Sequence, residues 1–240
     1  MKKFIGVVLI ICLLGLCGCW EKDEEETTQA PTQAPTEAVT EAIPGSVQHS
    51  VAKRIHASLP EFTFTLYGDP SEDYEDWNSY HTLAITGGGF HQRLEGFDTE
   101  SPFDAEDDFG LVFADFDNDG WLDVQLHQYP GGSMGNEPSL FWLWDSGLRR
   151  FVENAQLGDF SEDSGIHVED DGRISSYTRA GYGEYLNRYY AYMDGEFVLV
   201  ETQYATRETV GGQEFEIVEI HKLVDGGMSL TSTSRTLVED

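Results

Sequence analysis

The fold of this chain is decided by one acidic stretch, Asp115-Phe116-Asp117-Asn118-Asp119-Gly120-Trp121-Leu122-Asp123. Aspartates occupy loop positions 1, 3, 5 and 9, and the glycine at position 6 permits a sharp turn. Carboxylates held this close repel one another unless a cation lies between them. A plain Asp/Gly turn without a metal would therefore have an unfavourable electrostatic free energy. The pattern therefore predicts a calcium site. Its expected ligands are four side chains and the backbone carbonyl at position 7: Asp115, Asp117, Asp119, Asp123 and Trp121.

The residues flanking this loop predict strands, because apolar and polar residues alternate with a period of two. Leu111 and Phe113 show the pattern before the loop, and Val124 and Leu126 show it afterwards. An EF-hand would instead need a helix on each side and a glutamate at position 12, which here is Leu126. The loop is therefore expected to form the tip of a β-hairpin.

An aspartate loop between two strands resembles the calcium-binding blades of integrin-type (FG-GAP) β-propellers. A narrower likeness runs from Leu83 to Val200. It rests on the loop followed by Gly131-Gly132-Ser133-Met134-Gly135-Asn136, Phe141-Trp142-Leu143-Trp144-Asp145 and Tyr192-Met193-Asp194-Gly195-Glu196-Phe197. In this order the chain is similar to a family of small secreted bacterial calcium-binding β-propellers. At least one member is an immunity protein that inhibits a lysozyme-like cell-wall hydrolase, so the resemblance implies a binding role.

The first 18 residues have the pattern of a bacterial lipoprotein signal peptide. Lys2 and Lys3 precede an apolar run that is too short to span a membrane comfortably. Leu16 and Gly18 then occupy the −3 and −1 positions before Cys19, as in a lipobox. We therefore expect residues 1–18 to be removed, Cys19 to be acylated, and the protein to be anchored outside the cytoplasm of a bacterial cell.

Residues 19–44 predict a tether, because Glu, Thr, Gln, Ala and Pro dominate and almost nothing in the segment can be buried. The three cysteines, Cys12, Cys17 and Cys19, all lie at the N-terminus. The remaining domain, residues 45–240, therefore cannot contain a disulfide and must rely on core packing and bound metal.

Residues 45–240 read as an all-β domain, in which short apolar runs are separated by the turn dipeptides Asp171-Gly172, Asp194-Gly195 and Asp225-Gly226. Residues 47–59 are the only candidate for a short helix. At about 40 residues per blade, the length fits a small β-propeller of about five blades. A β-sandwich with a calcium-bearing hairpin is the alternative, because the metal motif occurs once. In the aromatic strand, Trp142 and Trp144 alternate with Phe141 and Leu143, so one pair is expected to face the core. Packing in the core or between blades is expected for the aromatic residues, with an exposed sugar- or protein-binding patch as the alternative.

The net charge of the protein indicates which classes of partner it can bind. Without Lys2 and Lys3 the chain carries 12 basic and 44 acidic residues, a formal charge of −32. Nucleic acid is excluded as a partner, because phosphate contacts need clustered Lys and Arg. A cationic envelope protein such as a cell-wall hydrolase fits this charge, although solubility alone also favours an acidic surface.

An enzyme is the alternative function. The segment Gly131-Gly132-Ser133-Met134-Gly135 matches the Gly-x-Ser-x-Gly pattern of serine hydrolases, with His167 and His221 downstream. A nucleophile elbow requires a helix after the serine, whereas Pro138 and an aromatic strand follow here. We therefore expect that the chain has no catalytic residue. The expected function is that of a membrane-anchored lipoprotein that binds an envelope protein or glycan. A secreted esterase or glycosidase is the alternative.

Overall fold

A computed structural model describes residues 43–72, 77–101, 110–128, 138–162 and 165–238. The chain divides into two units, Met1–Glu37 and Ala38–Asp240, and all described residues belong to the second. The expected signal peptide, Cys19, most of the tether and the segment 131–136 lie outside the described residues. Within the described ranges, no helix is both long enough and apolar enough to cross a membrane.

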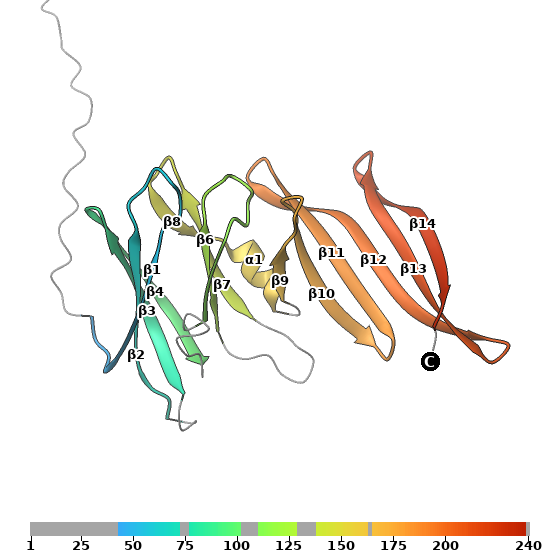
Figure 1. Ribbon diagram of the computed structural model, residues 1–240, viewed down its shortest axis with the longest axis horizontal. Coiled ribbons are helices and arrows are strands. Elements are labelled where there is room, and N and C mark those ends of the chain that lie inside the picture. Colours follow the sequence, from blue (N-terminus) through green and yellow to red (C-terminus); the bar gives the residue numbers. More distant parts are fainter. Residues whose placement is uncertain (1–42, 73–76, 102–109, 129–137, 163–164, 239–240) are drawn as a thin grey trace, which may run out of the picture. The chain divides into compact units, whose positions relative to one another are not determined.

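The prediction of an all-β domain is confirmed, with three antiparallel sheets in which chain neighbours pair in order (Figure 1). Sheet A contains β1 (Val47–Lys53), β2 (Phe62–Pro70), β3 (Asn78–Gly87) and β4 (Phe90–Ser101). Sheet B contains β5 (Leu111–Ala114), β6 (Asp123–His127), β7 (Ser139–Asp145) and β8 (Arg150–Glu153), followed by helix α1 (Ala155–Ser161). Sheet C contains β9 (Ile166–Val168), β10 (Ile174–Gly181), β11 (Glu184–Met193), β12 (Glu196–Val210), β13 (Gln213–Val224) and β14 (Gly227–Leu237).

Strand β7 of sheet B is buried on both faces. Trp142 and Trp144 of β7 pack with the apolar residues of sheet A in one hydrophobic cluster. Phe141 and Leu143 point the other way and pack with residues of α1 and sheet C in a second cluster. The alternation along this strand was correctly predicted, and the expectation of core packing is confirmed for both pairs, whereas the alternative of an exposed patch is wrong for this strand. A strand covered on both sides buries side chains on both faces, and local sequence does not reveal the second covering layer.

Two glutamine side chains tie neighbouring parts of the fold together. Gln92 of β4 donates to the carbonyl of Phe151 at 2.7 Å and accepts from its amide at 2.8 Å, which joins sheets A and B. Gln156 of α1 makes the same pair of bonds to Phe197 of β12, at 2.8 and 2.9 Å. Each amide thus satisfies a backbone donor and acceptor where no strand pairs with them.

The turn dipeptides behave as predicted at two of three places. Asp194 and Asp225 have φ of 54° and 49°, and the following glycines have φ of 91° and 81°, as in two-residue hairpin turns. The turn at Asp171-Gly172 is wider, because β9 ends at Val168 and β10 begins at Ile174.

The helix considered for residues 47–59 is not formed, and Val47–Lys53 is strand β1 instead. Its seven residues alternate between half-buried and exposed positions, which is the period of a strand at the edge of a sheet. The helix α1 lies elsewhere, and its N-cap Asn154 accepts a hydrogen bond from the amide of Leu157 at 3.0 Å.

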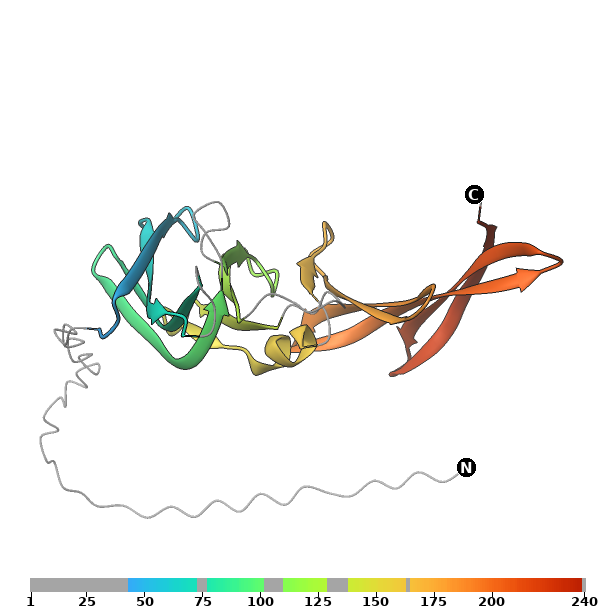
Figure 2. The same cartoon turned by 90° about the horizontal axis from the view of Figure 1, so that it is seen from below.

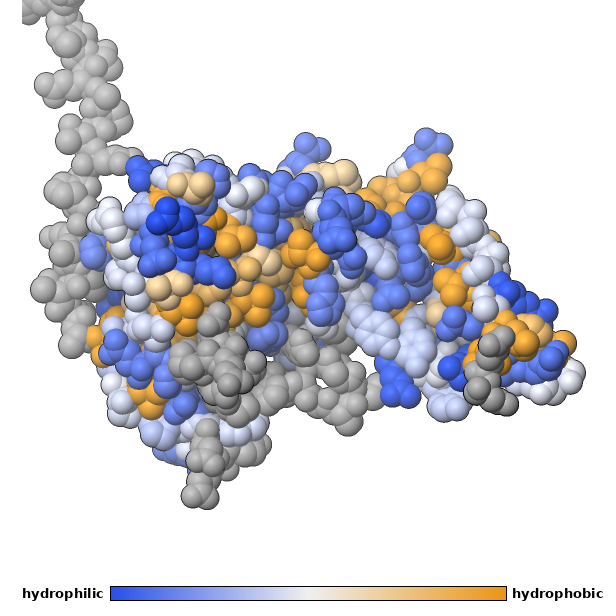
Figure 3. Space-filling view, viewed as in Figure 1, coloured by the Kyte–Doolittle hydropathy of each residue, from blue (hydrophilic) through white to orange (hydrophobic). Residues whose placement is uncertain are grey.

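The last strands of sheet C are far less buried than the rest. Figure 2 shows β13 and β14 at the end of the sheet beyond α1, and every residue of β14 is exposed. Apolar side chains of this part reach the surface, which Figure 3 shows as orange areas over β13 and β14. The core of the domain therefore lies in sheets A and B and the first strands of sheet C.

Candidate metal centre

The acidic loop joins β5 to β6, and the two strands pair antiparallel with Ala114 opposite Asp123. The predicted β-hairpin is therefore confirmed. Two residues in the loop have left-handed backbone conformations, Asn118 with φ of 58° and Gly120 with φ of 91°. Glycine adopts this conformation without strain and asparagine tolerates it, so these two positions turn the chain back on itself.

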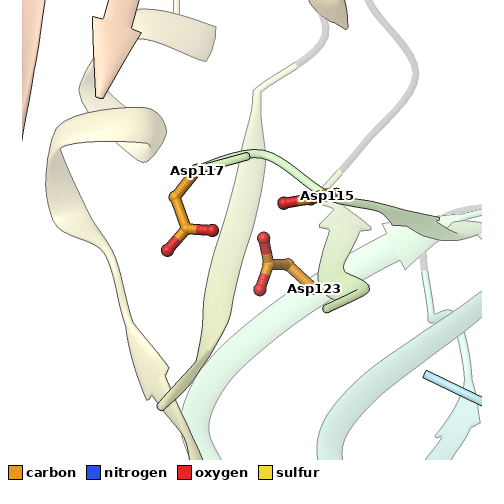
Figure 4. A group of neighbouring side chains, drawn as sticks. All are labelled: Asp115, Asp117 and Asp123. Carbon is orange, nitrogen blue, oxygen red and sulfur yellow. The ribbon is translucent and has the colours of Figure 1, made fainter. Parts of the chain in front are cut away.

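The side chains of Asp115, Asp117 and Asp123 converge on one space, as Figure 4 shows. Each offers an oxygen atom, and these three oxygens all lie within 4.8 Å of one another. Oxygens around a calcium ion at about 2.3 to 2.6 Å are separated by up to about 5 Å, so the spacing fits an ion at their centre. The structure thus brings together three of the four predicted carboxylates.

The fourth carboxylate, Asp119, is not part of this group. Its Oδ1 accepts a hydrogen bond from the backbone amide of Trp121 at 2.9 Å. The indole of Trp121 packs on His56, with ring centroids 3.9 Å apart, and on Trp144 at 6.0 Å. The next residue, Leu122, donates its amide to the carbonyl of Ile55 at 2.9 Å. These contacts fix the end of the loop to the segment that follows β1.

Asp115 organises the loop from its first position. Its Oδ1 accepts from the amide of Asp119 at 3.0 Å, and its Oδ2 accepts from the amide of Gly120 at 2.9 Å. A carboxylate has about four acceptor positions, so both oxygens retain lone pairs for an ion. The backbone therefore holds this ligand in place before any metal arrives.

Asp123 is the buried anchor of the site and has no exposed surface. Its Oδ2 accepts from the amide of Phe116 at 2.9 Å, and its Oδ1 accepts from the amide of Trp144 in β7 at 2.8 Å. Burial raises the pKa of this carboxyl to about 8, although the two hydrogen bonds act in the opposite direction. The neighbouring charges of Asp117 and Asp119 raise the pKa further. The side chain is thus both a structural link to β7 and a candidate ligand.

Asp117 is the side chain whose surroundings point most directly to a cation. Burial, followed by the charges of Asp119 and Asp115, raises the pKa of Asp117 to about 7. Partial removal from water also raises the pKa of Asp119. The Oδ1 atom of Asp117 is buried and has no hydrogen-bond partner in the part of the chain that the structure describes. Such an atom is costly unless something binds it, and a divalent ion between the three carboxylates fits this role.

A cavity of about 300 Å³ lies beside the loop. Among the described residues, four carboxylates and no basic side chain line it. The carboxylates are Asp117, Asp119, Asp145 and Glu153, and the other lining residues are Leu143, Trp144, Ser146, Val152, Asn154 and Tyr192. Sequence reasoning missed Asp145, Glu153 and Tyr192, because they come from β7, β8 and β11 and share no spacing with the loop. Asp145 reads as an ordinary turn residue, and it does accept from the amides of Gly147 and Leu148 at 2.9 and 2.7 Å.

The wide turn between β9 and β10 touches the acidic loop. A Cβ atom added at Gly172 would come within 2.6 Å of the Asn118 side chain. Gly172 also has φ of 81°, which side chains rarely adopt. Only glycine therefore lets this turn of sheet C approach the loop so closely.

A serine and a histidine also lie close together in sheet B, which bears on the enzyme alternative. Ser139 Oγ is 3.2 Å from His127 Nδ1, and it lies 3.0 Å from Gln125 Nε2, which donates to it. The amide of Ser139 donates to Ser161 Oγ at 2.9 Å. Ser139 is 1% exposed, so its hydroxyl serves packing between β6, β7 and α1 and is out of reach of a substrate. Ser133, the serine of the Gly-x-Ser-x-Gly pattern, lies outside the described residues.

Comparison with known proteins supports the fold and does not reach function. No family model matches the chain, and no curated protein matches it. A solved structure described as "Structure of a Xanthomonas Type IV Secretion System related protein" is similar, with a TM-score of 0.58 and 16% sequence identity. The match covers 78% of this chain and 99% of that one. At this identity the likeness concerns the fold alone, so the chain shares its arrangement of strands with a secretion-system-related protein.

Proposed function

We propose that this protein is a lipid-anchored extracytoplasmic protein whose β-domain is stabilised by one calcium ion and binds an envelope protein or glycan. The observation that carries the metal site is the buried Oδ1 of Asp117, which has no hydrogen-bond partner among the described residues and belongs to a carboxylate that converges with Asp115 and Asp123. Hard oxygen donors in a turn between strands suit calcium better than softer metals. The anchor is proposed from Cys19 and the segment that precedes it.

The proposed role of calcium is structural. The ion would supply the positive charge that three converging carboxylates lack, while four backbone amides position two of them, Asp115 and Asp123. Because Asp123 also binds the amide of Trp144, an ordered loop is directly linked to the central strand of the core. Asp119 completes the proposed ligand set through a short side-chain movement or through a water molecule, as ligands of calcium loops often do.

A propeller is the finer architecture that we propose. Sheets A and B are each four-stranded antiparallel meanders, which is the composition of a propeller blade. Sheet C has six strands, more than one blade requires. The expected number of about five blades stays a prediction.

The proposed partner is cationic. The chain carries a formal charge of −30, and four carboxylates line the cavity beside the loop without a basic neighbour among the described residues of that lining. Such a surface attracts basic proteins over long range and speeds their association at low salt. The kinship with an inhibitor of a lysozyme-like hydrolase, implied by the loop and its flanking segments, makes a cell-wall hydrolase the first partner to test.

The metal site is tested by melting curves in calcium and in chelator. An ion at 100 times its dissociation constant stabilises a fold by about 2.7 kcal/mol, so chelation should lower the melting temperature by several degrees. We expect Asp119→Ala to abolish most of this difference. Asp159→Ala, which removes an exposed carboxylate of α1, is the matched control and should leave the difference intact. An identical melting curve in chelator and calcium would contradict the site.

The partner and the anchor need separate experiments. Protection of peptidoglycan from a basic lysozyme-type hydrolase, measured with and without calcium and at two salt concentrations, tests the binding role. We expect protection that weakens as salt rises, and its absence at low salt would contradict a hydrolase partner. Labelling of cells with a radioactive fatty acid tests the anchor, since Cys19→Ser should remove all label from the protein.

A further inference from the structure

The outer edge of sheet C is an open strand edge. β14 pairs with β13, and no other described strand pairs with its second edge. Every residue of β14 is exposed, so the strand has almost no core contacts of its own. An open edge offers a row of backbone donors and acceptors that match another strand.

Most natural sheet edges carry a feature that prevents pairing with another strand, and β14 has one such feature, a β-bulge. The register between β13 and β14 shifts at Ile220/His221, which leaves Thr231 as a bulge. Beyond this bulge, Ser232–Leu237 pairs in regular register from Ile220 to Phe215. This regular stretch contains no proline and no acidic residue. Its single charge, Arg235, is already engaged by Glu208 at 3.7 Å and by the ring of Phe215 at 4.0 Å.

The chemistry of this edge selects its partner. Two copies of a chain with formal charge −30 repel each other almost everywhere. The edge stretch is an exception, because it presents hydroxyl side chains and no carboxylate. Ser and Thr residues facing Ser and Thr across an antiparallel pair are favourable neighbours. A strand of this kind therefore fits a second copy of itself.

We propose that two copies of this protein associate through the outer edges of β14, which pair antiparallel over Ser232–Leu237 about a two-fold axis. The pairing joins two six-stranded sheets into one continuous sheet and leaves no open edge at the junction. It also partly covers Leu237, which is 42% exposed in the single copy. The same patch serves both copies, so the assembly closes at two and does not propagate.

The contact is small, and small interfaces are typically weak and transient. The association should therefore depend on protein concentration. On a membrane surface, an anchored chain would reach high local concentrations more easily than a free one. This proposal does not depend on calcium binding, since none of its residues lies in the acidic loop.

The test uses residues 19–240 with Cys19→Ser, so that no lipid drives association, in sedimentation velocity over a wide concentration range with calcium present. We expect a monomer–dimer equilibrium. Ser234→Lys with Thr236→Lys should abolish it, because four lysines would meet across the two-fold axis. The variant is expected to fold, since position 236 faces Glu216 on β13. Thr206→Lys with Thr209→Lys adds the same charge on β12, at positions that pair with Ile217 and Glu214 of β13 and lie away from β14, and should still dimerise.

Amide hydrogen exchange tests the same contact without the lysine variant. Amide hydrogen exchange across Ser232–Leu237 in the unmodified sequence should slow as protein concentration rises, while exchange at the turn Asp194-Gly195 should stay constant. A monomer at every concentration, or a dimer that survives the lysine substitutions, would overturn the proposal. Concentration-independent exchange in β14 would overturn it as well.

Discussion

Replacement of Asp117 by asparagine should reverse the order of stability between variant and wild type when calcium is removed. The substitution keeps the size of the side chain and removes one of three converging negative charges. In calcium the variant loses a ligand, so we expect it to be less stable than the wild type. In chelator the variant is relieved of a poorly solvated charge, so we expect it to be more stable.

The magnitude follows from the surroundings of this carboxyl. Burial and two neighbouring aspartates raise its pKa from 3.8 to about 7. Each pKa unit corresponds to about 1.4 kcal/mol, so without screening by solvent the ionised carboxylate would destabilise the native state by roughly 4 kcal/mol relative to the protonated form. Asp117 is only half-buried, and screening by solvent reduces this to about 2 kcal/mol. Calcium at 100 times its dissociation constant would stabilise the wild type by about 2.7 kcal/mol.

The sign of the pH dependence is fixed by the direction of the shift. A pKa raised above the ordinary value means that the native state binds the proton more tightly than the unfolded chain does. Its contribution to stability is fully present below pH 3.8 and is lost as pH rises through about 7. The metal-free wild type should therefore weaken between these values, and the advantage of Asp117→Asn in chelator should grow over the same range.

Urea unfolding followed by tryptophan fluorescence measures these differences, because Trp121 and Trp144 lie against the loop and pack on each other. The free energy of unfolding is compared for both proteins at pH 5 and pH 8, in calcium and in chelator. Asp159→Asn serves as the control for loss of one exposed charge. If Asp117→Asn destabilises the protein equally in both solutions, the site does not bind a cation and the reasoning is refuted.

Three other substitutions separate the roles of nearby residues. Asp123→Ala should lower the free energy of unfolding by about 2 to 6 kcal/mol even in chelator, because two buried backbone amides lose their acceptor. The loss should be larger in calcium, where a ligand is removed as well, and a loss seen only in calcium would contradict the structural role. Gly172→Ala should lower the melting temperature and weaken calcium binding measured by calorimetry, because the added Cβ would displace Asn118 in the loop. An unchanged calcium affinity would show that the turn at Gly172 does not influence the ion site. Gln156→Ala should lower the free energy of unfolding in urea by about 1 to 3 kcal/mol, because it removes the two hydrogen bonds between Gln156 and the backbone of Phe197. Gln213→Ala, at an exposed strand end, is the control and should leave the free energy of unfolding unchanged.

The acidic loop was readable from sequence because its chemistry is local. Four aspartates and a glycine within nine residues fix both the turn and the kind of ligand, and alternating apolar residues on each side fix the strands. The hairpin was confirmed on this basis. What spacing did not show is that the group of three converging carboxylates leaves out Asp119, or that Asp123 accepts a hydrogen bond from the amide of Trp144.

The lining of the cavity and the formation of strand β1 depend on residues that are far apart in sequence. Asp145, Glu153 and Tyr192 reach the cavity beside the loop from three strands, and their own neighbours give no hint of it. The strand at Val47–Lys53 is similar, because its pairing with β2 overrides the weak local preference that had suggested a helix.

Local sequence was enough to predict the all-β class, the turns at Asp194-Gly195 and Asp225-Gly226, and the place of the candidate ion site, whereas calcium as its ion stays a prediction. These properties depend on backbone conformations and ligand atoms within a few residues of one another. Only the tertiary structure decided that strand β7 of sheet B is covered on both faces, which Trp142 and Phe141 show by packing in different clusters. It alone also left the edge of β14 open. Both outcomes depend on which sheet lies beside which, and that choice is made by the burial of surfaces contributed by distant segments.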